Sequence, residues 1–186
     1  MVSTLLIGDT HIPERASAIP DPLRRVVESR RFEFVLCTGD LTSGEVLRYL
    51  QSLGKNLRVV SGNMDRLPFP ASDIVIVEGV RIGLTHGAQV HPRGDVQGLA
   101  RIASGMGVDV LVSGHTHRLF VDRIREGFGG VLLLNPGSAT GVWSGGFSSG
   151  VPSLLFLEVT HQGLTVEAYE LKPEGLDRMI LDLASL

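Results

Sequence analysis

Several kinds of residue and segment are scarce in this 186-residue chain, and each scarcity excludes a class of protein. No stretch approaches the roughly 18 uninterrupted apolar residues that a membrane-spanning helix needs. Met1 leads into the strand-like segment 3–7, without the basic segment with which a secretory signal begins. Cys37 is the only cysteine and has apolar neighbours, so we expect a buried thiol and no internal disulfide. These features predict a cytoplasmic protein without a membrane segment.

Positive charge is also limited, because the formal net charge is −3 and the isoelectric point is near 6.1. Proteins that grip a nucleic-acid backbone usually present a broadly basic surface. Nucleic acid is therefore a disfavoured partner, although it is not excluded. The length and the 43% hydrophobic content suit one core, which predicts a single domain over residues 1–186.

Apolar runs alternate with helical patterns over the first two-thirds of the chain, as in a layered α/β domain. Asp21 before Pro22, and Thr42 before Glu45, resemble helix starts, and a third helix is expected after Asp95. Gly54 should end the second helix.

Strands are expected to be more frequent from Asp73 onward. Turn signals occur at 78–79, 129–130 and 162–163. Near the end of the chain, helical spacing of apolar residues predicts an amphipathic terminal helix, which would pack on its own sheet or on a neighbouring subunit. The residues of that apolar face are Leu176, Met179, Ile180 and Leu183.

Five segments end an apolar, strand-like run with small or polar residues and then a potential metal ligand. In open α/β sheets, ligands bind beyond the carboxyl ends of the strands, so these side chains are expected to converge. Glycines beside them would allow close backbone approach. The segments are residues 5–11, 35–40, 59–63, 82–87 and 110–117, and the candidate ligands are Asp9, His11, Asp40, Asn63, His86, His115 and His117.

Two pairs of candidates are two residues apart, Asp9 with His11 and His115 with His117, and an extended chain turns such residues to one side. One such Asp is more often a turn former, and one such His is more often a surface residue. Seven in the same context point to a metal site. Carboxylate, amide and imidazole together suit Mn, Fe, Zn, Ni or Co better than Ca.

The order of these motifs resembles the calcineurin-like metallophosphoesterase superfamily over residues 5–138, including 135–138. The short chain looks most like the small prokaryotic phosphodiesterase branch, which is related to the phosphoesterase-like subunit of eukaryotic retromer. The resemblance implies a four-layer αββα sandwich of two mixed β-sheets. It also implies two divalent metals, with Mn expected first: Asp9, His11 and His117 on one, Asn63, His86 and His115 on the other, and Asp40 bridging.

The resemblance further implies in-line attack on phosphorus by water or hydroxide that two metals activate about 3.5 to 4 Å apart. Asp40, Asn63 and Asp65 would be the catalytic residues, with Asp65 orienting a neighbouring group. Many relatives have His where this chain has Met64, and methionine cannot supply a proton. The expected result is a lower rate, or a preference for leaving groups that depart without protonation.

Ala88 is a second departure, at a position where relatives often have another His. His91 could reach the pocket as a substitute proton donor, and Arg93 and Arg118 could contact a phosphate, although ordinary surface roles are favoured for each. The expected substrate is a small phosphate ester; a nuclease is also possible, but a cyclic or short nucleotide fits the compact, acidic chain somewhat better than a nucleic-acid duplex does. The alternative is a phosphoesterase-like scaffold that binds a protein partner and keeps a structural or vestigial metal site. The sequence leaves the oligomeric state open, including a homo-oligomer.

Overall fold

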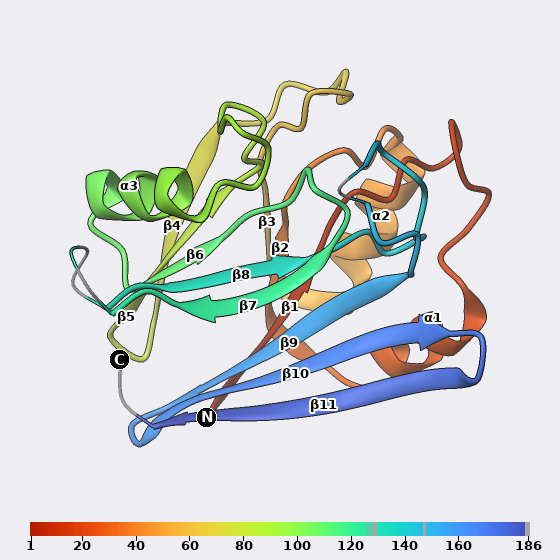
Figure 1. The fold of residues 1–186 in the computed structure, drawn as a ribbon. Helices are drawn as coiled ribbons and strands as arrows, with labels where there is room; N and C mark the ends of the chain where they lie inside the picture. Colours follow the sequence, from red (N-terminus) through yellow and green to blue (C-terminus); the bar gives the residue numbers. More distant parts are fainter. Residues whose placement is uncertain (126, 128–129, 147, 185–186) are drawn as a thin grey trace.

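Two β-sheets pack face to face in the computed structural model, which describes residues 1–125, 127, 130–146 and 148–184 (Figure 1). The first sheet has six strands in the order β11-β10-β9-β1-β2-β3. Strands β1, β2 and β3 run parallel, and β9, β10 and β11 are antiparallel. Its strands are β1 (Val2–Ile7), β2 (Phe32–Cys37), β3 (Gly54–Val59), β9 (Ser153–Thr160), β10 (Gly163–Lys172) and β11 (Gly175–Ala184).

The second sheet has five strands in the order β4-β5-β6-β8-β7. Strands β5, β6 and β8 are parallel, whereas β4 and β7 pair antiparallel at the two edges. Its strands are β4 (Ser72–Val77), β5 (Val80–Thr85), β6 (Val110–Val112), β7 (Leu119–Arg123) and β8 (Leu132–Pro136). Both sheets are therefore mixed, as expected.

Three helices cover the outer faces of the sheets, which completes the predicted αββα order (Figure 1). Helices α1 (Asp21–Glu28) and α2 (Gly44–Leu53) pack on the six-stranded sheet, and α3 (Val96–Met106) packs on the five-stranded sheet. A separate apolar layer lies between the sheets and includes Leu6, Leu36 and Leu155. No helix among the described residues is long and apolar enough to cross a membrane.

The three helices predicted at Asp21, Thr42 and Asp95 exist, but two of them begin differently from the prediction. The carboxylate of Asp21 accepts from Arg24 instead of capping α1, whose N-cap is Pro20. Ser43, not Thr42, caps α2, because the Thr42 hydroxyl donates to the carbonyl of Ile12. Gly54 ends α2, and Asp95 caps α3 through the amide of Gly98, both as expected.

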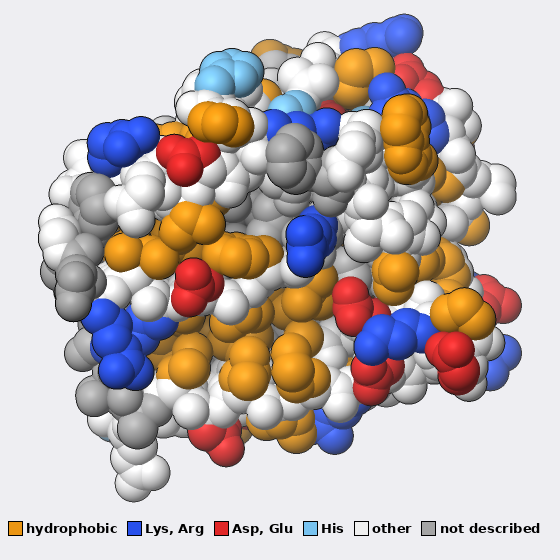
Figure 2. All heavy atoms as spheres, in the orientation of Figure 1, with side chains coloured by type: hydrophobic (Ala, Val, Ile, Leu, Met, Phe, Trp, Pro, Cys, Tyr) orange, Lys and Arg blue, Asp and Glu red, His pale blue; other side chains and the backbone are white. Residues whose placement is uncertain are grey.

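The prediction of a terminal helix was wrong, because residues 175–184 form strand β11. This strand pairs with β10 along its whole length, from Lys172 opposite Gly175 to Gly163 opposite Ala184. Hydrophobic side chains gather between β7 and the β9–β11 strands in Figure 2, and the partly buried Leu181 and Leu183 pack on the layer between the sheets. The hairpins at 78–79 and near 162–163 are confirmed. The break at 129–130 lies partly outside the described residues.

Candidate metal centre

The carboxyl ends of the parallel strands of both sheets meet at one end of the sandwich. Backbone hydrogen bonds join their loops: the amide of Asp9 donates to Gly39 O over 2.9 Å, and that of His11 to Asp40 O over 2.9 Å. Across the two segments of the other sheet, the amide of Gly114 donates to His86 O over 3.0 Å. The candidate ligands are therefore carried on a connected set of loops.

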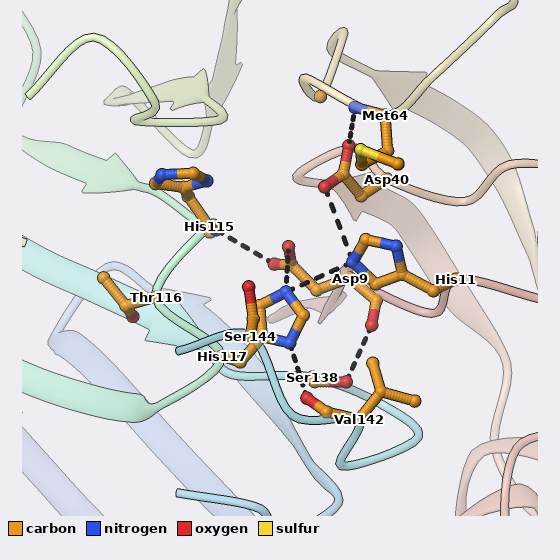
Figure 3. Close-up of polar contacts among 12 residues, drawn as sticks. Asp9, His11, Asp40, Met64, His115, Thr116, His117, Ser138, Val142 and Ser144 are labelled. Atoms are coloured by element: carbon orange, nitrogen blue, oxygen red, sulfur yellow. Dashed lines mark hydrogen bonds and ion pairs between the residues drawn. The ribbon is translucent and has the colours of Figure 1, made fainter. Parts of the chain in front are cut away.

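Asp9, His11 and His117 form one buried group, each 2% exposed or less (Figure 3). The Nε2 atoms of His11 and His117 lie 3.2 Å apart. His117 Nε2 is also 3.2 Å from Asp9 Oδ1. Three potential ligand atoms thus point at a common centre.

Asp9, Asp40 and His86 form a second buried group. Asp40 Oδ2 lies 3.6 Å from His86 Nε2 and 3.5 Å from His11 Nε2. The carboxylate of Asp40 therefore faces a histidine of each group. This is the position that a bridging ligand requires.

Asn63 and His115 lie at the outer edge of the same site. Asn63 Oδ1 is 3.0 Å from His86 Nε2. The ring of His115 packs edge to face on that of His86, with 5.0 Å between centroids, and its amide donates to Asp9 Oδ2 over 3.0 Å. The structure thus brings all seven predicted residues together, with Asn63 exposed and His115 half-buried.

Backbone carbonyls set the tautomers of two histidines. His117 Nδ1 is 2.7 Å from Val142 O, and His86 Nδ1 is 2.8 Å from Thr38 O. Because a carbonyl only accepts, each Nδ1 carries the proton, and in the neutral ring the lone pair is on Nε2. Both Nε2 atoms face the carboxylates, as metal-ligating imidazoles do when a second partner orients them.

The charge state of the cluster favours cation binding. Burial lowers the pKa of His11 to about 4, and burial and Arg93 lower that of His115 to about 4. Burial alone would raise the pKa of Asp9, but the adjacent ring of His117 and the charges of the histidines lower it. At neutral pH, neutral His11 and His115 therefore lie beside an ionised Asp9. Burial lowers the pKa of His117, but Asp9 and the carbonyl of Val142 outweigh it and raise that pKa.

The spacing of the ligand atoms suits a divalent metal, whereas their hydrogen bonding to one another is incomplete. Asp9 Oδ1, which faces His117, is buried and has no hydrogen-bond partner. A metal with ligands at about 2.0–2.2 Å separates adjacent ligand atoms by roughly 3.0–3.5 Å. The spacing of 3.2 Å between Nε2 atoms of His11 and His117 falls in this range. Nitrogen and oxygen donors together suit Mn, Fe, Zn, Ni or Co.

The backbone reaches this arrangement through left-handed residues, not through the extended pairs that we expected. Asp9, His11 and Asp40 have φ of 50°, 47° and 52°, and His115 and His117 have 68° and 55°. Such conformations cost about 1–3 kcal/mol each outside glycine and cluster at functional sites. The i, i+2 pairs do face one cluster, but tight turns after the strands orient them.

Neighbouring glycines make the close approach of the loops sterically possible. A Cβ on Gly62 would lie 2.0 Å from Asp40 Oδ1, and one on Gly114 would lie 2.6 Å from Asp9 Oδ2. Side chains at these positions would displace the two carboxylates. The expectation that glycine permits close packing beside the ligands is confirmed at these two positions.

Asp65 holds the Asp40 and Asn63 loops together. Its carboxylate accepts four backbone amides, those of Asp40 (2.8 Å), Gly62 (2.9 Å), Leu41 (3.1 Å) and Thr42 (3.2 Å). Every one of these donors belongs to the backbone of the two loops. The geometry is that of a positioning residue.

Met64 takes part in the site through its backbone, because its amide donates to Asp40 Oδ1 over 2.7 Å. His91 is exposed and lines a separate surface hollow with Gln89 and Arg101. Arg118 is exposed as well. Arg93 does approach the site: its guanidinium donates to His115 O, to Ser144 O and, over 2.8 Å, to Ser144 Oγ.

Sequence reasoning missed the backbone partners of the ligands, above all Thr38 and Val142. It also missed Ser138 Oγ, which donates to Asp9 O over 2.7 Å. For Ser138, the motif at 135–138 was the only signal in the sequence. Thr38 and Val142 gave no signal, because every residue type has a backbone carbonyl.

The sequence model of the calcineurin-like phosphoesterase superfamily domain matches residues 2–161, and the chain belongs to this superfamily. A probable metallophosphoesterase from Methanothermobacter thermautotrophicus is 44% identical over 138 residues, which is 73% of this chain and 76% of that protein.

Solved structures of Vps29 share the whole fold. Vacuolar Protein Sorting 29 of Cryptosporidium parvum is 31% identical, with a TM-score of 0.93 over 99% of this chain and 98% of that one. Wild-type Vps29 of Entamoeba histolytica is 36% identical, with a TM-score of 0.89 over 97% and 98% of the two chains. A predicted phosphoesterase of Streptococcus pneumoniae, 20% identical with a TM-score of 0.68 over 97% and 98%, shows similarity of fold alone.

Proposed function

We propose that the chain is a metal-dependent phosphodiesterase. The observation that carries the proposal is the buried cluster of facing ligand atoms on Asp9, His11, Asp40, His86 and His117, in which Asp9 Oδ1 has no hydrogen-bond partner. Membership of the phosphoesterase superfamily supports it. So does the structure of E. histolytica Vps29, which was solved as a complex with Zn²⁺.

Asp9, His11 and His117 would hold one divalent ion, and His86, Asn63 and His115 a second, with Asp40 between them. Mn is the first candidate, followed by Ni, Fe, Zn and Co. When bound, such a pair supplies Lewis acidity toward the phosphoryl oxygens and lowers the pKa of water.

The chain's own residues would contribute orientation and charge. Val142 O and Thr38 O keep Nε2 of His117 and His86 as lone-pair donors. Asp65 fixes the Asp40 and Asn63 loops and would not touch the reacting atoms. Met64 brings no proton to a leaving oxygen, so esters of acidic alcohols, whose anions leave unprotonated, are the favoured substrates.

Hydrolysis assays with metal add-back test this function. The purified protein is stripped with chelator, Mn²⁺ is restored, and cleavage of bis(p-nitrophenyl) phosphate is compared with that of p-nitrophenyl phosphate. We expect Mn-dependent cleavage of the diester, reduced about 100-fold or more in Asp40→Asn, as when a group that stabilises transition-state charge is lost. The exposed Asp122→Asn should match the wild type. Diester cleavage that survives in Asp40→Asn, or that no metal restores, contradicts the proposal.

A protein-interaction role is the second candidate. Chaetomium thermophilum Vps29, which is 29% identical with a TM-score of 0.79, was crystallised with a cyclic peptide. The absence of hydrolysis with every metal, together with a normal thermal unfolding transition, would favour this role.

A further inference from the structure

The loop 141–146 is tied to the two histidines of the 115–117 segment. Val142 O accepts from His117 Nδ1 over 2.7 Å, and Arg93 bridges Ser144 to the carbonyl of His115. Figure 3 shows Val142 and Ser144 on this loop beside His117. The amide of Gly141 also donates to Ser138 O over 3.2 Å. The loop is thus anchored at the rim of the metal centre by residues on both sides of position 143.

Trp143 lies between these anchors and is 72% exposed. It is the only tryptophan of the chain, and no residue of 141–146 carries a charge. The hydrophobic effect disfavours an indole ring in water. Because Val142 and Ser144 on either side of it are anchored, the loop loses less conformational entropy when a ligand binds. A large exposed aromatic side chain therefore lies one residue from the carbonyl that orients His117.

The charges around this rim suit an anionic ligand. Arg93 is a cation beside the loop, and its guanidinium is close enough to Asp9 and Asp40 for both charges to act on its pKa. In a phosphodiester bound at the cluster, the phosphate would contact the metal and not the carboxylates of Asp9 and Asp40 directly. The guanidinium of Arg93 would lie beside it. The substituent of the phosphodiester would extend toward the exposed indole.

We propose that Trp143 is a specificity-determining residue that stacks on the nucleobase of a nucleoside phosphodiester held at the metal centre. This inference rests on the proposed function and names its substrate class. Stacking on an aromatic side chain tolerates every base, because every base has a π face. It would favour nucleotide esters over alkyl esters without selecting a particular base.

Binding is tested by the fluorescence of Trp143, which reports on this position alone because the chain has no other tryptophan. The full-length protein with Zn²⁺ is excited at the red edge of the tryptophan absorption band. It is titrated with thymidine 5′-monophosphate and, separately, with ribose 5-phosphate. We expect saturable quenching by the nucleotide and none by the sugar phosphate. Equal responses, or no response to either, would overturn the proposal.

Kinetics supply the second readout. The thymidine 5′-monophosphate ester of p-nitrophenol and ethyl p-nitrophenyl phosphate share a leaving group, so the ratio of their kcat/KM values isolates the thymidine. Trp143→Leu should lower this ratio at least about fivefold, the lower end of what stacking of one base contributes, and Trp143→Phe should restore most of it. An unchanged ratio overturns the proposal. If the wild type hydrolyses neither ester, the proposed function fails, and the titration still decides whether Trp143 binds a base.

Discussion

Asp65→Asn replaces one carboxylate oxygen by an amide donor while keeping the size of the side chain. In the native structure Oδ1 accepts from Leu41 and Thr42, and Oδ2 accepts from Asp40 and Gly62. Whichever oxygen is lost, two backbone amides then face a donor. Hydrogen bonds to a charged group contribute about 1.5–3 kcal/mol each, so we expect a loss of about 3 kcal/mol in the free energy of unfolding.

The same change should weaken metal binding. Asp40 and Thr42 have left-handed φ of 52° and 61°, and the amides bonded to Asp65 help to hold them there. Released from these bonds, the Asp40 loop relaxes toward ordinary conformations. We expect the Mn²⁺ affinity to fall at least about tenfold, as for partners that orient ligands.

Urea unfolding of the chelated protein measures the first effect, and calorimetric titration with Mn²⁺ measures the second. Asp182→Asn is the control, because Asp182 is exposed and bonds only Thr165 Oγ1 among the described side chains. It should stay within about 0.5 kcal/mol of the wild type. If Asp65→Asn were equally stable and bound Mn²⁺ normally, the positioning role of this carboxylate would be refuted.

Three further substitutions test other parts of the structure. Gly62→Ala should lower Mn²⁺ affinity in calorimetry at least about tenfold, because its Cβ would meet Asp40 Oδ1 at 2.0 Å, whereas Gly105→Ala, in open space, should not. Arg93→Met should also lower this affinity about tenfold, since it releases His115 from the 141–146 loop. Glu167→Gln should lower the free energy of unfolding by about 2 kcal/mol at pH 7, because it weakens pairs with Arg30 and Arg178. Burial opposes ionisation of Glu167, but hydrogen bonds from Arg30, Tyr169 and Arg178 lower its pKa below 4.5. The difference in stability between Glu167→Gln and the wild type should therefore be complete above pH 4.5 and vanish as the pH falls through the lowered pKa. A stability difference that persists in acid would refute the ion-pair explanation.

The convergence of the candidate ligands was predictable because parallel strands end at the same edge of a sheet. Asp9, Asp40 and His86 each follow such a strand, and their residue types reveal the chemistry. The left-handed turns that aim them were not predictable, since Asp and His adopt such φ only when surrounding contacts impose it.

The terminal strand was mispredicted for a related reason. Met179, Leu181 and Leu183 alternate as a strand requires, yet Leu176, Met179 and Leu183 also fit a helix, and only pairing with β10 decides between the two periods. The role of Arg93 was equally hidden, because its partners at 115 and 144 lie 22 and 51 residues away.

Anomalous diffraction from crystals soaked in Mn²⁺ would locate the bound metal directly. We expect two peaks about 3.5–4 Å apart, one among Asp9, His11 and His117 and the other beside His86 and Asn63, with Asp40 between them. No peak, or a single ion away from Asp40, would contradict this expectation.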